Sequence, residues 1–392
     1  WTQTRHQRLD EWIRPEILDA DLAPLVLELA AWGVNDPDAV VWLDSPPRGH
    51  WQQAKDLLHQ LQAVDQQGHI TAQGRDMAAL PLHPRLAHML LAAAGTSGQN
   101  LAADIAALLS DRNPLLRQPG SSMPVDLTLR LSALNDWRQR DTTAGGDRKR
   151  LQQLDRLSRQ FLKMLPGKVS TDTGNEISAG ICLAMAYPDR VAKRRSGRDS
   201  YLMRNGRGVR IPEDDSLAGS DYLVIANLDA GQRDGRAWLA STIRHAEIEQ
   251  LFTEQIQQQR IIRWDSQRQT AIAREVTRLG EITLMERQVA LQADDPVIEI
   301  LLERVRNHGL SLFGEQKKLD SLRARVQTIR RVDKTGDWPE VSESGLLNNL
   351  EDWLLPWLDK VDSLKQIRQL NLLEMFQAWL GWEKLQQLND LL

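Results

Sequence analysis

The sequence is poor in cysteine and contains no long hydrophobic segment. Cys182 is the only cysteine among the 392 residues, which excludes an internal disulfide and a cysteine-based zinc site. This composition predicts a reducing compartment, and we expect a cytoplasmic protein. No apolar run approaches the roughly 20 residues of a membrane span, and the start of the chain lacks the apolar core of a signal peptide. We therefore expect no membrane partner.

Motifs of several enzyme classes are also missing. The nearest match to a phosphate-binding Walker A loop, Gly167-Lys168-Val169-Ser170, lacks the upstream glycine and its spacing, so we interpret it as an ordinary loop. There is no H-E-x-x-H motif, and His83 and His88 are five residues apart, which does not align them on one helix face. Glu213-Asp214-Asp215 is better explained as a solvated turn than as a cation site. Cys182 lies in a predicted apolar strand, where burial would raise its pKa. We find no catalytic residue and no metal site, and we expect this chain to bind no cofactor.

The size and composition of the chain are those of a multidomain globular protein. A length of 392 residues exceeds one ordinary core, and the hydrophobic fraction of 41% is typical of folded domains. The net charge of −4 does not exclude nucleic-acid binding, because the charge on one face decides it. The sequence does not begin with Met and ends on Leu391-Leu392, so we expect it to be part of a longer protein. The patterns below predict a multidomain, mainly α fold with a small β-barrel.

Residues 1–78 have the element order of a winged helix. A first helix begins near Asp21, a second contains Trp51 to Leu61, and residues 64–70 form a hairpin that turns at Gly68. Thr71 is placed to cap a short helix that follows. Many such modules bind DNA and many only pack against neighbouring domains. Because no dense basic row lies on a recognition helix, we favour the packing role.

Three further regions follow from changes of hydrophobic period. Residues 79–170 are helical throughout, with apolar stripes that are ordinary core faces. Residues 171–291 have β patterns and fit a small Greek-key barrel, with one helix at 245–259. The predicted strands are 181–187, 201–204, 208–211, 222–228, 236–242, 271–278 and 282–287. Residues 292–392 are helical and rich in tryptophan, a residue that most often fills cores and interfaces.

The basic stretch from Asp189 to Arg210 is a local concentration of positive charge in a slightly acidic chain. Glycine turns separate short apolar segments in it, so the stretch fits strands of the small barrel, and a basic barrel face is a plausible nucleic-acid platform. A solvated charged surface explains the stretch about equally well. Tyr201 could stack on a base, although its alternating position favours a core role at least as much. The candidate contacts are Lys193, Arg194, Arg195, Arg198, Tyr201, Arg204, Arg207 and Arg210.

Several segments resemble the region that follows the second motor domain of DEAH-box RNA helicases, and most closely the bacterial HrpB-type ATP-dependent helicases. The resemblance covers about residues 1–290 well and the helical remainder more loosely. It is carried by segments 14–18, 21–29, 33–36, 42–47, 54–58, 65–71, 80–87, 108–114, 184–191, 201–202 and 205–208. It implies a winged helix over 1–78, a helical ratchet bundle over 79–170, an OB-fold over 171–291 and a C-terminal helical region over 292–392.

The resemblance also implies a function. In this family two RecA-like motor domains hydrolyse ATP with Mg, and the accessory region guides a single strand of nucleic acid past them. We therefore expect single-stranded nucleic acid as partner, RNA in the first place and DNA as an alternative, together with the motor domains of the same protein. This chain, which lacks the motor motifs, should not hydrolyse ATP alone. The ratchet bundle adds the candidate contacts Arg112, Asn113 and Arg117. A winged-helix DNA-binding regulator and a protein-docking scaffold remain as alternatives.

Overall fold

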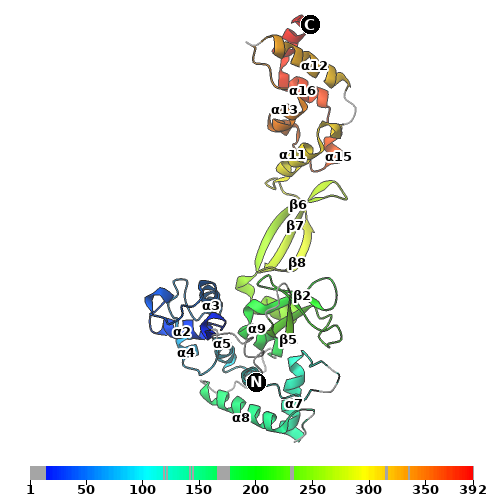
Figure 1. Ribbon diagram of the computed structural model, residues 1–392. Helices are drawn as coiled ribbons and strands as arrows, with labels where there is room; N and C mark the ends of the chain where they lie inside the picture. The colour runs from blue at the N-terminus through cyan, green and yellow to red at the C-terminus, as the bar shows by residue number, and fades with distance from the viewer. Residues whose placement is uncertain are drawn as a thin grey trace, which may run out of the picture. The chain divides into compact units, whose positions relative to one another are not determined.

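The computed structural model describes residues 15–117, 120, 122–140, 143, 145–165, 177–229, 234–313, 317–333 and 336–391. The chain forms two compact units (Figure 1). The first comprises residues 1–256 with the short turn 279–282, and the second comprises residues 257–278 and 283–392. The loop predicted at Gly167–Ser170 lies outside the described residues. The division into four domains, at residues 78, 170 and 291, stays a prediction.

The first unit begins with the winged helix and a group of helices. The winged-helix elements are η1 (Glu16–Leu18), α2 (Ala23–Ala31), η2 (Pro37–Ala39), α3 (Arg48–Gln60) and α4 (Ala72–Ala78). The helical bundle contains α5 (Pro84–Ala93), α6 (Gln99–Ser110), α7 (Leu127–Arg140), α8 (Arg148–Met164) and α9 (Ala179–Ala186). The predicted cap is confirmed, because the hydroxyl of Thr71 accepts a hydrogen bond of 2.9 Å from the backbone N–H of Gly74. The predicted hairpin is reduced to one bridge between Val64 and Ile70.

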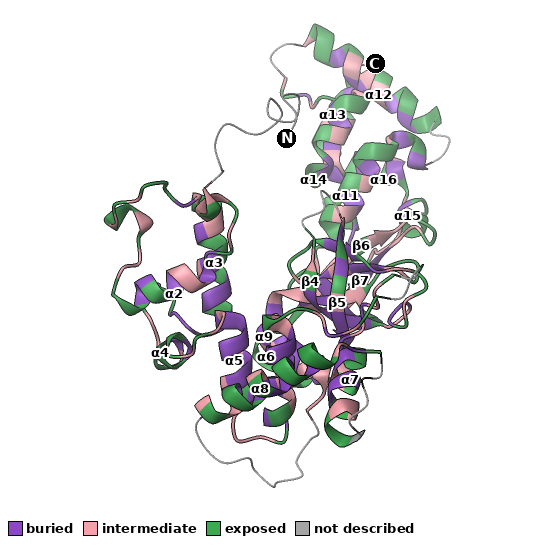
Figure 2. Ribbon diagram, turned by 60° about the horizontal axis from the view of Figure 1, so that its bottom comes forward, coloured by how far each residue is buried: buried purple, intermediate pink, exposed green. Residues whose placement is uncertain are grey.

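The rest of the first unit is a closed barrel in the order β1-β2-β3-β5-β4. It follows η3 (Pro188–Arg190) and precedes α10 (His245–Leu251) and η4 (Thr253–Gln255). β3 pairs in parallel with β5, and the other barrel pairs are antiparallel. Buried residues line these strands, as Figure 2 shows. The strands are β1 (Val191–Arg194), β2 (Ser200–Met203), β3 (Gly208–Arg210), β4 (Tyr222–Leu228) and β5 (Asp234–Thr242).

The structure corrects the predicted strand at 181–187, which is the helix α9. Ser178 caps this helix with its hydroxyl. Buried residues occur all round it because α9 packs between α5, α6 and the barrel strands β4 and β5. A short, continuously apolar segment has the same pattern as a buried strand, so periodicity could not separate the two. A side chain at Gly180 would place its Cβ 2.1 Å from the backbone oxygen of Thr242, so this glycine permits the close approach of α9 to β5.

The barrel also takes up fewer residues than predicted, because its last strand ends at Thr242 and not near residue 291. The predicted strands 271–278 and 282–287 form, but they pair in a separate sheet with β6 (Gln257–Asp265). The first three residues of β6 were predicted to belong to the helix 245–259, and no strand was predicted for the other six. The polar start of β6, Gln257 to Gln259, gave no strand pattern in the sequence. The order of this sheet is β6, β7 (Thr270–Leu279) and β8 (Ile282–Val289).

The second unit combines this sheet with a helical core. Its core contains Trp338 and Trp353, whereas Trp382 is exposed. Segment 362–364 hydrogen-bonds to residues 269–271 beside the end of β7. The helices are α11 (Val297–His308), η5 (Leu310–Phe313), α12 (Lys317–Val332), α13 (Glu343–Asn348), α14 (Leu350–Trp353), η6 (Leu355–Trp357), α15 (Leu364–Ile367), α16 (Leu372–Leu380) and α17 (Trp382–Leu391).

Candidate nucleic-acid interface

The basic stretch lies on strands β1 to β3 of the barrel and on the turns between them. Antiparallel pairing sets Arg194 opposite Tyr201, and Ser200 opposite Arg210. Parallel pairing of β3 with β5 brings Asp234 beside Gly208. A Cβ at Gly208 would lie 1.7 Å from the carboxylate of Asp234, so a side chain there would displace that carboxylate. The barrel therefore brings side chains that are far apart in the sequence, such as Arg195 and Asp234, within 3.6 Å of each other.

Aspartates neutralise several of the predicted arginines. Arg194 donates to Asp221 at 2.8 Å, and this hydrogen bond raises the pKa of Arg194. The carboxylate of Asp234 forms ion pairs with Arg195 at 3.6 Å and with Arg210 at 3.5 Å. Arg210 also donates to Asp199 at 2.9 Å. The surface is thus less positive than the sequence indicates, although exposed ion pairs of this kind are weak and can exchange a carboxylate for a phosphate.

The remaining predicted cations differ in their accessibility. Arg207 is exposed, and no described carboxylate pairs with it. Arg198 is exposed and donates weakly to the backbone oxygen of Ala218 at 3.4 Å. Lys193 lies 5.9 Å from the ring centre of Tyr222. Arg204 is half-buried over Phe252 and donates to Gln255, and burial lowers its pKa. Arg198 and Arg207 are therefore the most available of these cations.

The structure corrects the stacking role considered for Tyr201. Its ring is completely buried in the barrel core, and its hydroxyl donates to the backbone oxygen of Leu217 at 3.2 Å. Burial raises the pKa of this phenol. A base cannot stack on a ring that has no exposed surface, so Tyr201 stabilises the barrel and does not contact a strand in this conformation.

The ratchet candidates lie in the loop after α6. Arg112 and Arg117 are exposed, whereas Asn113 is half-buried. The side chain of Asn113 accepts the backbone N–H of Leu115 at 3.0 Å, so it shapes the loop. Its backbone oxygen accepts Arg150 of α8 at 2.7 Å, which ties the loop to the start of that helix.

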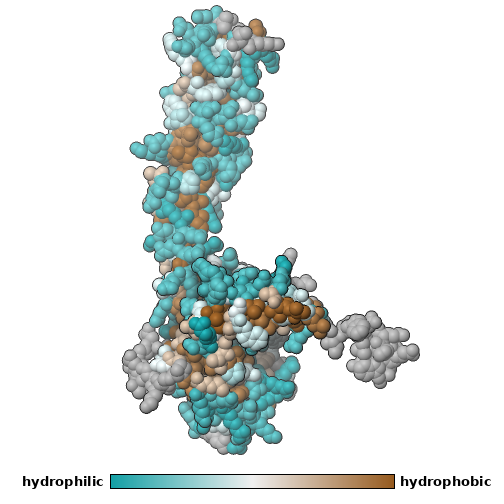
Figure 3. Space-filling view, turned by 90° about the vertical axis from the view of Figure 1, so that its left-hand side faces the viewer, coloured by the Kyte–Doolittle hydropathy of each residue, from teal (hydrophilic) through white to brown (hydrophobic). Residues whose placement is uncertain are grey.

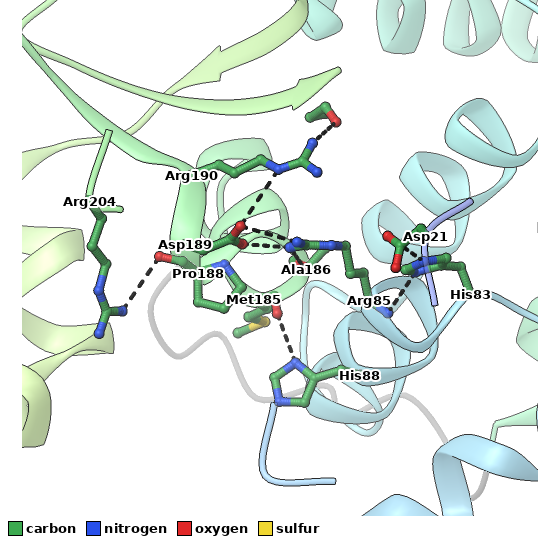
Figure 4. A network of polar contacts seen from close by, with 11 residues as sticks. Asp21, His83, Arg85, His88, Met185, Ala186, Pro188, Asp189, Arg190 and Arg204 are labelled. Carbon is green, nitrogen blue, oxygen red and sulfur yellow. Dashed lines mark hydrogen bonds and ion pairs between the residues drawn. The ribbon is translucent and has the colours of Figure 1, made fainter. Parts of the chain in front are cut away.

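A network of polar side chains joins the winged helix, α5 and the start of the barrel (Figure 4). Arg85 on α5 donates to both oxygens of Asp189, at 2.6 and 3.1 Å, and to the backbone oxygen of Ala186. Tyr187 has Arg85 on its ring at 4.9 Å and Arg190 at 5.0 Å. Burial by itself raises the pKa of Asp189, but the charge and hydrogen bonds of Arg85 outweigh it, so the net pKa is lowered. This network ties α5 to the segment that leads into β1. Arg190 is half-buried in it, 3.7 Å from Asp189, and donates to the backbone oxygen of Ala226 at 3.0 Å.

Two histidines extend the network. His83 lies 3.2 Å from the carboxylate of Asp21, through its Nε2 atom. Nδ1 of His88 donates to the backbone oxygen of Met185 at 2.8 Å, and burial lowers the pKa of His88. The two histidines therefore connect α5 to different neighbours, His83 to Asp21 and His88 to Met185. They do not converge on one site.

The Asp21–His83 contact predicts an acid-sensitive contribution to stability. The hydrogen bond to His83 lowers the pKa of Asp21 from 3.8 to about 2. A lowered folded-state pKa stabilises the fold above the unfolded value, and this stabilisation is lost as pH falls from about 4 through about 2. We expect Asp21→Asn to lower the free energy of unfolding by less than about 1 kcal/mol near neutral pH, because the carboxylate is half exposed, and to match the wild type near pH 2. Urea unfolding over this range measures it, with Asp76→Asn as control. A difference that does not change with pH would contradict the assignment.

The described residues contain no group of three or more side chains suited to hold a metal ion, and none of their helices is long and apolar enough to cross a membrane. Cys182 lies inside α9, and burial raises the pKa of its thiol to about 12. The direction predicted for this pKa is confirmed, although the predicted strand was wrong.

Sequence reasoning missed two features of the interface. The partner Asp221 immediately precedes β4 and the partner Asp234 is the first residue of β5, and no local signal indicates that they meet the basic stretch. The cations of α8 did have a signal, because Arg148, Arg156, Arg159 and Lys163 recur at helical spacing. The predicted core face of this helix accounts only for its apolar residues.

Comparison with known proteins agrees with this architecture. Residues 56–82 match the winged-helix family "Helicase associated domain (HA2)". The chain is 31% identical over 383 residues to the ATP-dependent RNA helicase HrpB of Escherichia coli, covering 96% of this chain and 44% of that protein. It is 25% identical over 229 residues to the probable ATP-dependent RNA helicase DHR2 of Saccharomyces cerevisiae, covering 58% of this chain and 30% of that protein. The chain therefore spans less than half the length of these relatives.

A solved structure extends the likeness to the fold. The crystal structure of the E. coli DExH-box NTPase HrpB matches with a TM-score of 0.58 and 30% identity, over 99% of this chain and 45% of that one. The predicted resemblance to HrpB-type helicases is confirmed, and so is the predicted fold class, mainly α with a closed barrel and a winged helix.

Proposed function

We propose that this chain is the nucleic-acid-binding accessory region of an ATP-dependent RNA helicase and guides a single strand past the motor domains. The observation that carries the proposal is the homology to HrpB along almost the whole chain. The exposed cations on the barrel support it, because phosphate contacts give affinity without sequence information. In the intact protein ATP and Mg would be bound by RecA-like motor domains, and this chain alone would not hydrolyse ATP. The strand would be RNA in the first place, with DNA as an alternative.

In this proposal the winged helix is the joint to the motor domains. Trp32, Val41 and Leu43 are exposed around the segment between α2 and α3, with exposed fractions of 78%, 99% and 101%. Figure 3 shows hydrophobic residues gathered on the face of the first unit that carries the winged helix. Apolar side chains in such a group favour burial against another domain. The helix α3, in contrast, contains Arg48 and Lys55 as its only Lys or Arg residues, and this low density of cations argues against a base-reading regulator.

The charge-reversal variant Arg194→Glu/Arg195→Glu/Arg207→Glu tests the proposal. We expect single-stranded RNA to bind the wild-type chain without sequence preference, and the variant to bind at least about tenfold more weakly at low salt. The slope of log K against log salt should shrink by about 2, since each lost phosphate contact contributes about 0.7 for a single strand. Fluorescence anisotropy titrations at several salt concentrations measure both quantities.

The matched control carries the same change of charge on the second unit, as Lys360→Glu/Lys365→Glu/Arg368→Glu at exposed positions. Equal losses in the two variants would show a general charge effect and overturn the barrel assignment. An unchanged affinity and salt slope in the barrel variant would favour a protein-docking scaffold. A strong preference for one RNA or DNA sequence would favour the DNA-binding regulator. ATP hydrolysis by the purified chain would contradict the proposal that only the motor domains hydrolyse ATP.

A further inference from the structure

The exposed face of α8 carries positive charge that the barrel proposal does not use. The exposed side chains of this helix are all cations or glutamines: Arg148, Lys149, Arg150, Gln152, Gln153, Arg156, Arg159, Gln160 and Lys163. Its buried face holds Leu151, Leu154 and Phe161 against the bundle. In Figure 3 the lower end of the first unit, where Figure 1 places α7 and α8, is mostly hydrophilic.

The cations form one row along the helix. At 3.6 residues per turn, Arg148, Lys149, Arg156, Arg159 and Lys163 fall within an arc of about 100°, and the row is about 22 Å long. Two carboxylates on or before the helix lie outside this arc. Asp147 caps the N-terminus, where it accepts from the backbone of Lys149 and Arg150. Asp155 is buried and is shared between Arg138 at 2.7 Å and Arg159 at 3.0 Å.

Much of this charge is left for a partner. No described carboxylate pairs with Lys149, Arg156 or Lys163. The side chain of Arg159 is 70% exposed although it contacts Asp155. The loop that holds Arg112 and Arg117 runs beside the start of α8, because Leu115 bridges to Gly146 and Asp147 donates its backbone N–H to Pro114. A chain with a net charge of −4 thus concentrates cations along one face of α8.

We propose that this face, α8 with Arg112 and Arg117, binds the phosphate backbone of double-stranded RNA. Surfaces for single strands combine cations with aromatic side chains on which bases stack, and the exposed face of α8 has none. A straight, rigid row of cations instead matches a rigid rod of phosphates. The interspersed glutamines can donate to phosphate and ribose oxygens, which is how duplex RNA is recognised by shape. The surface lies on different residues from the barrel, so it stands if the single-strand path fails.

The test uses the full chain, a blunt-ended RNA duplex of mixed sequence, and the variant Lys149→Gln/Arg156→Gln/Lys163→Gln. Glutamine is a good helix former, so exposed substitutions on α8 leave the fold intact. We expect duplex affinity to fall at least about tenfold at low salt and the salt slope to shrink by about 2 to 3, at about 0.9 per phosphate contact. The charge-conserving variant Lys149→Arg/Arg156→Lys/Lys163→Arg should bind as the wild type does.

Further outcomes separate the alternatives. The glutamine variant should bind single-stranded RNA within about twofold of wild type, and the barrel variant should retain duplex binding. Failure of the wild type to bind the duplex, or equal duplex binding by wild type and glutamine variant, overturns the proposal and favours an acidic protein surface as the partner. An equal loss of single-strand and duplex binding also overturns it, because α8 would then belong to the single-strand path. A DNA duplex bound as tightly as the RNA duplex would overturn the preference for RNA.

Discussion

Replacement of Arg85 with alanine is expected to lower the free energy of unfolding of the first unit by about 3 kcal/mol, near the lower end of the range for breaking a buried ion pair. Arg85 is 6% exposed and holds both oxygens of Asp189, whose side chain is 20% exposed. Its loss would leave a largely buried carboxylate with Arg190 as the nearest cation, at 3.7 Å. That residual pairing keeps the expected cost below the top of the range.

A double-mutant cycle with Asp189→Asn distinguishes the ion pair from the loss of packing. If the pair is the cause, the double variant should lose much less than the sum of the two single changes. Hydrogen exchange followed by mass spectrometry localises the effect, and α5, α9 and β1 should exchange faster while α16 does not. If Arg85→Ala lowers the free energy of unfolding by less than about 1 kcal/mol, Arg190 can replace Arg85 as the partner of Asp189. That result would contradict the role of this network in holding α5 against the start of the barrel.

The second large effect is expected in the other unit. Trp353→Ala should lower the free energy of unfolding of the second unit by about 3 to 5 kcal/mol, as for other buried tryptophans. The indole is 1% exposed, its N–H donates to the backbone oxygen of Leu346 at 2.9 Å, and its ring lies 6.3 Å from that of Phe313. The truncation removes a large apolar surface from the core, leaves a cavity and removes one of the two hydrogen bonds that the backbone oxygen of Leu346 accepts, the other coming from the backbone N–H of Asn349 at 3.3 Å.

Trp382→Ala is the matched control, because Trp382 belongs to the same unit and is 77% exposed. Its effect should stay within about 0.5 kcal/mol. Urea unfolding measures the stability of both variants, and hydrogen exchange of the native proteins localises the change. The helices α11 to α16 should lose protection from exchange only in Trp353→Ala. Equal effects of the two substitutions would mean that Trp353 does not anchor this core.

The two proposed nucleic-acid surfaces differ in how they could be found. The barrel stretch is conspicuous because its cations are adjacent in sequence, yet in the structure Asp199, Asp221 and Asp234 offset part of that charge. The face of α8 is less conspicuous because its cations alternate with apolar residues, yet its exposed arc contains no carboxylate. Local charge density in a sequence therefore overstates the first surface and understates the second.

The sequence by itself determined the class of the fold, the helical bundle with a small barrel, and the resemblance to HrpB-type helicases, because hydrophobic period and turn residues act over a few neighbouring positions. It also determined where along the chain the cations lie, since charge is a property of each residue. Only the tertiary structure decided that 181–187 is a helix, that Tyr201 is buried, and that β6 to β8 form a sheet apart from the barrel. It alone decided which arginines meet an aspartate. Each of these outcomes depends on segments that are far apart in the chain. The physical reason is that the free energy of burial or of ion pairing depends on the groups that surround a residue in space, and not on its neighbours in the sequence.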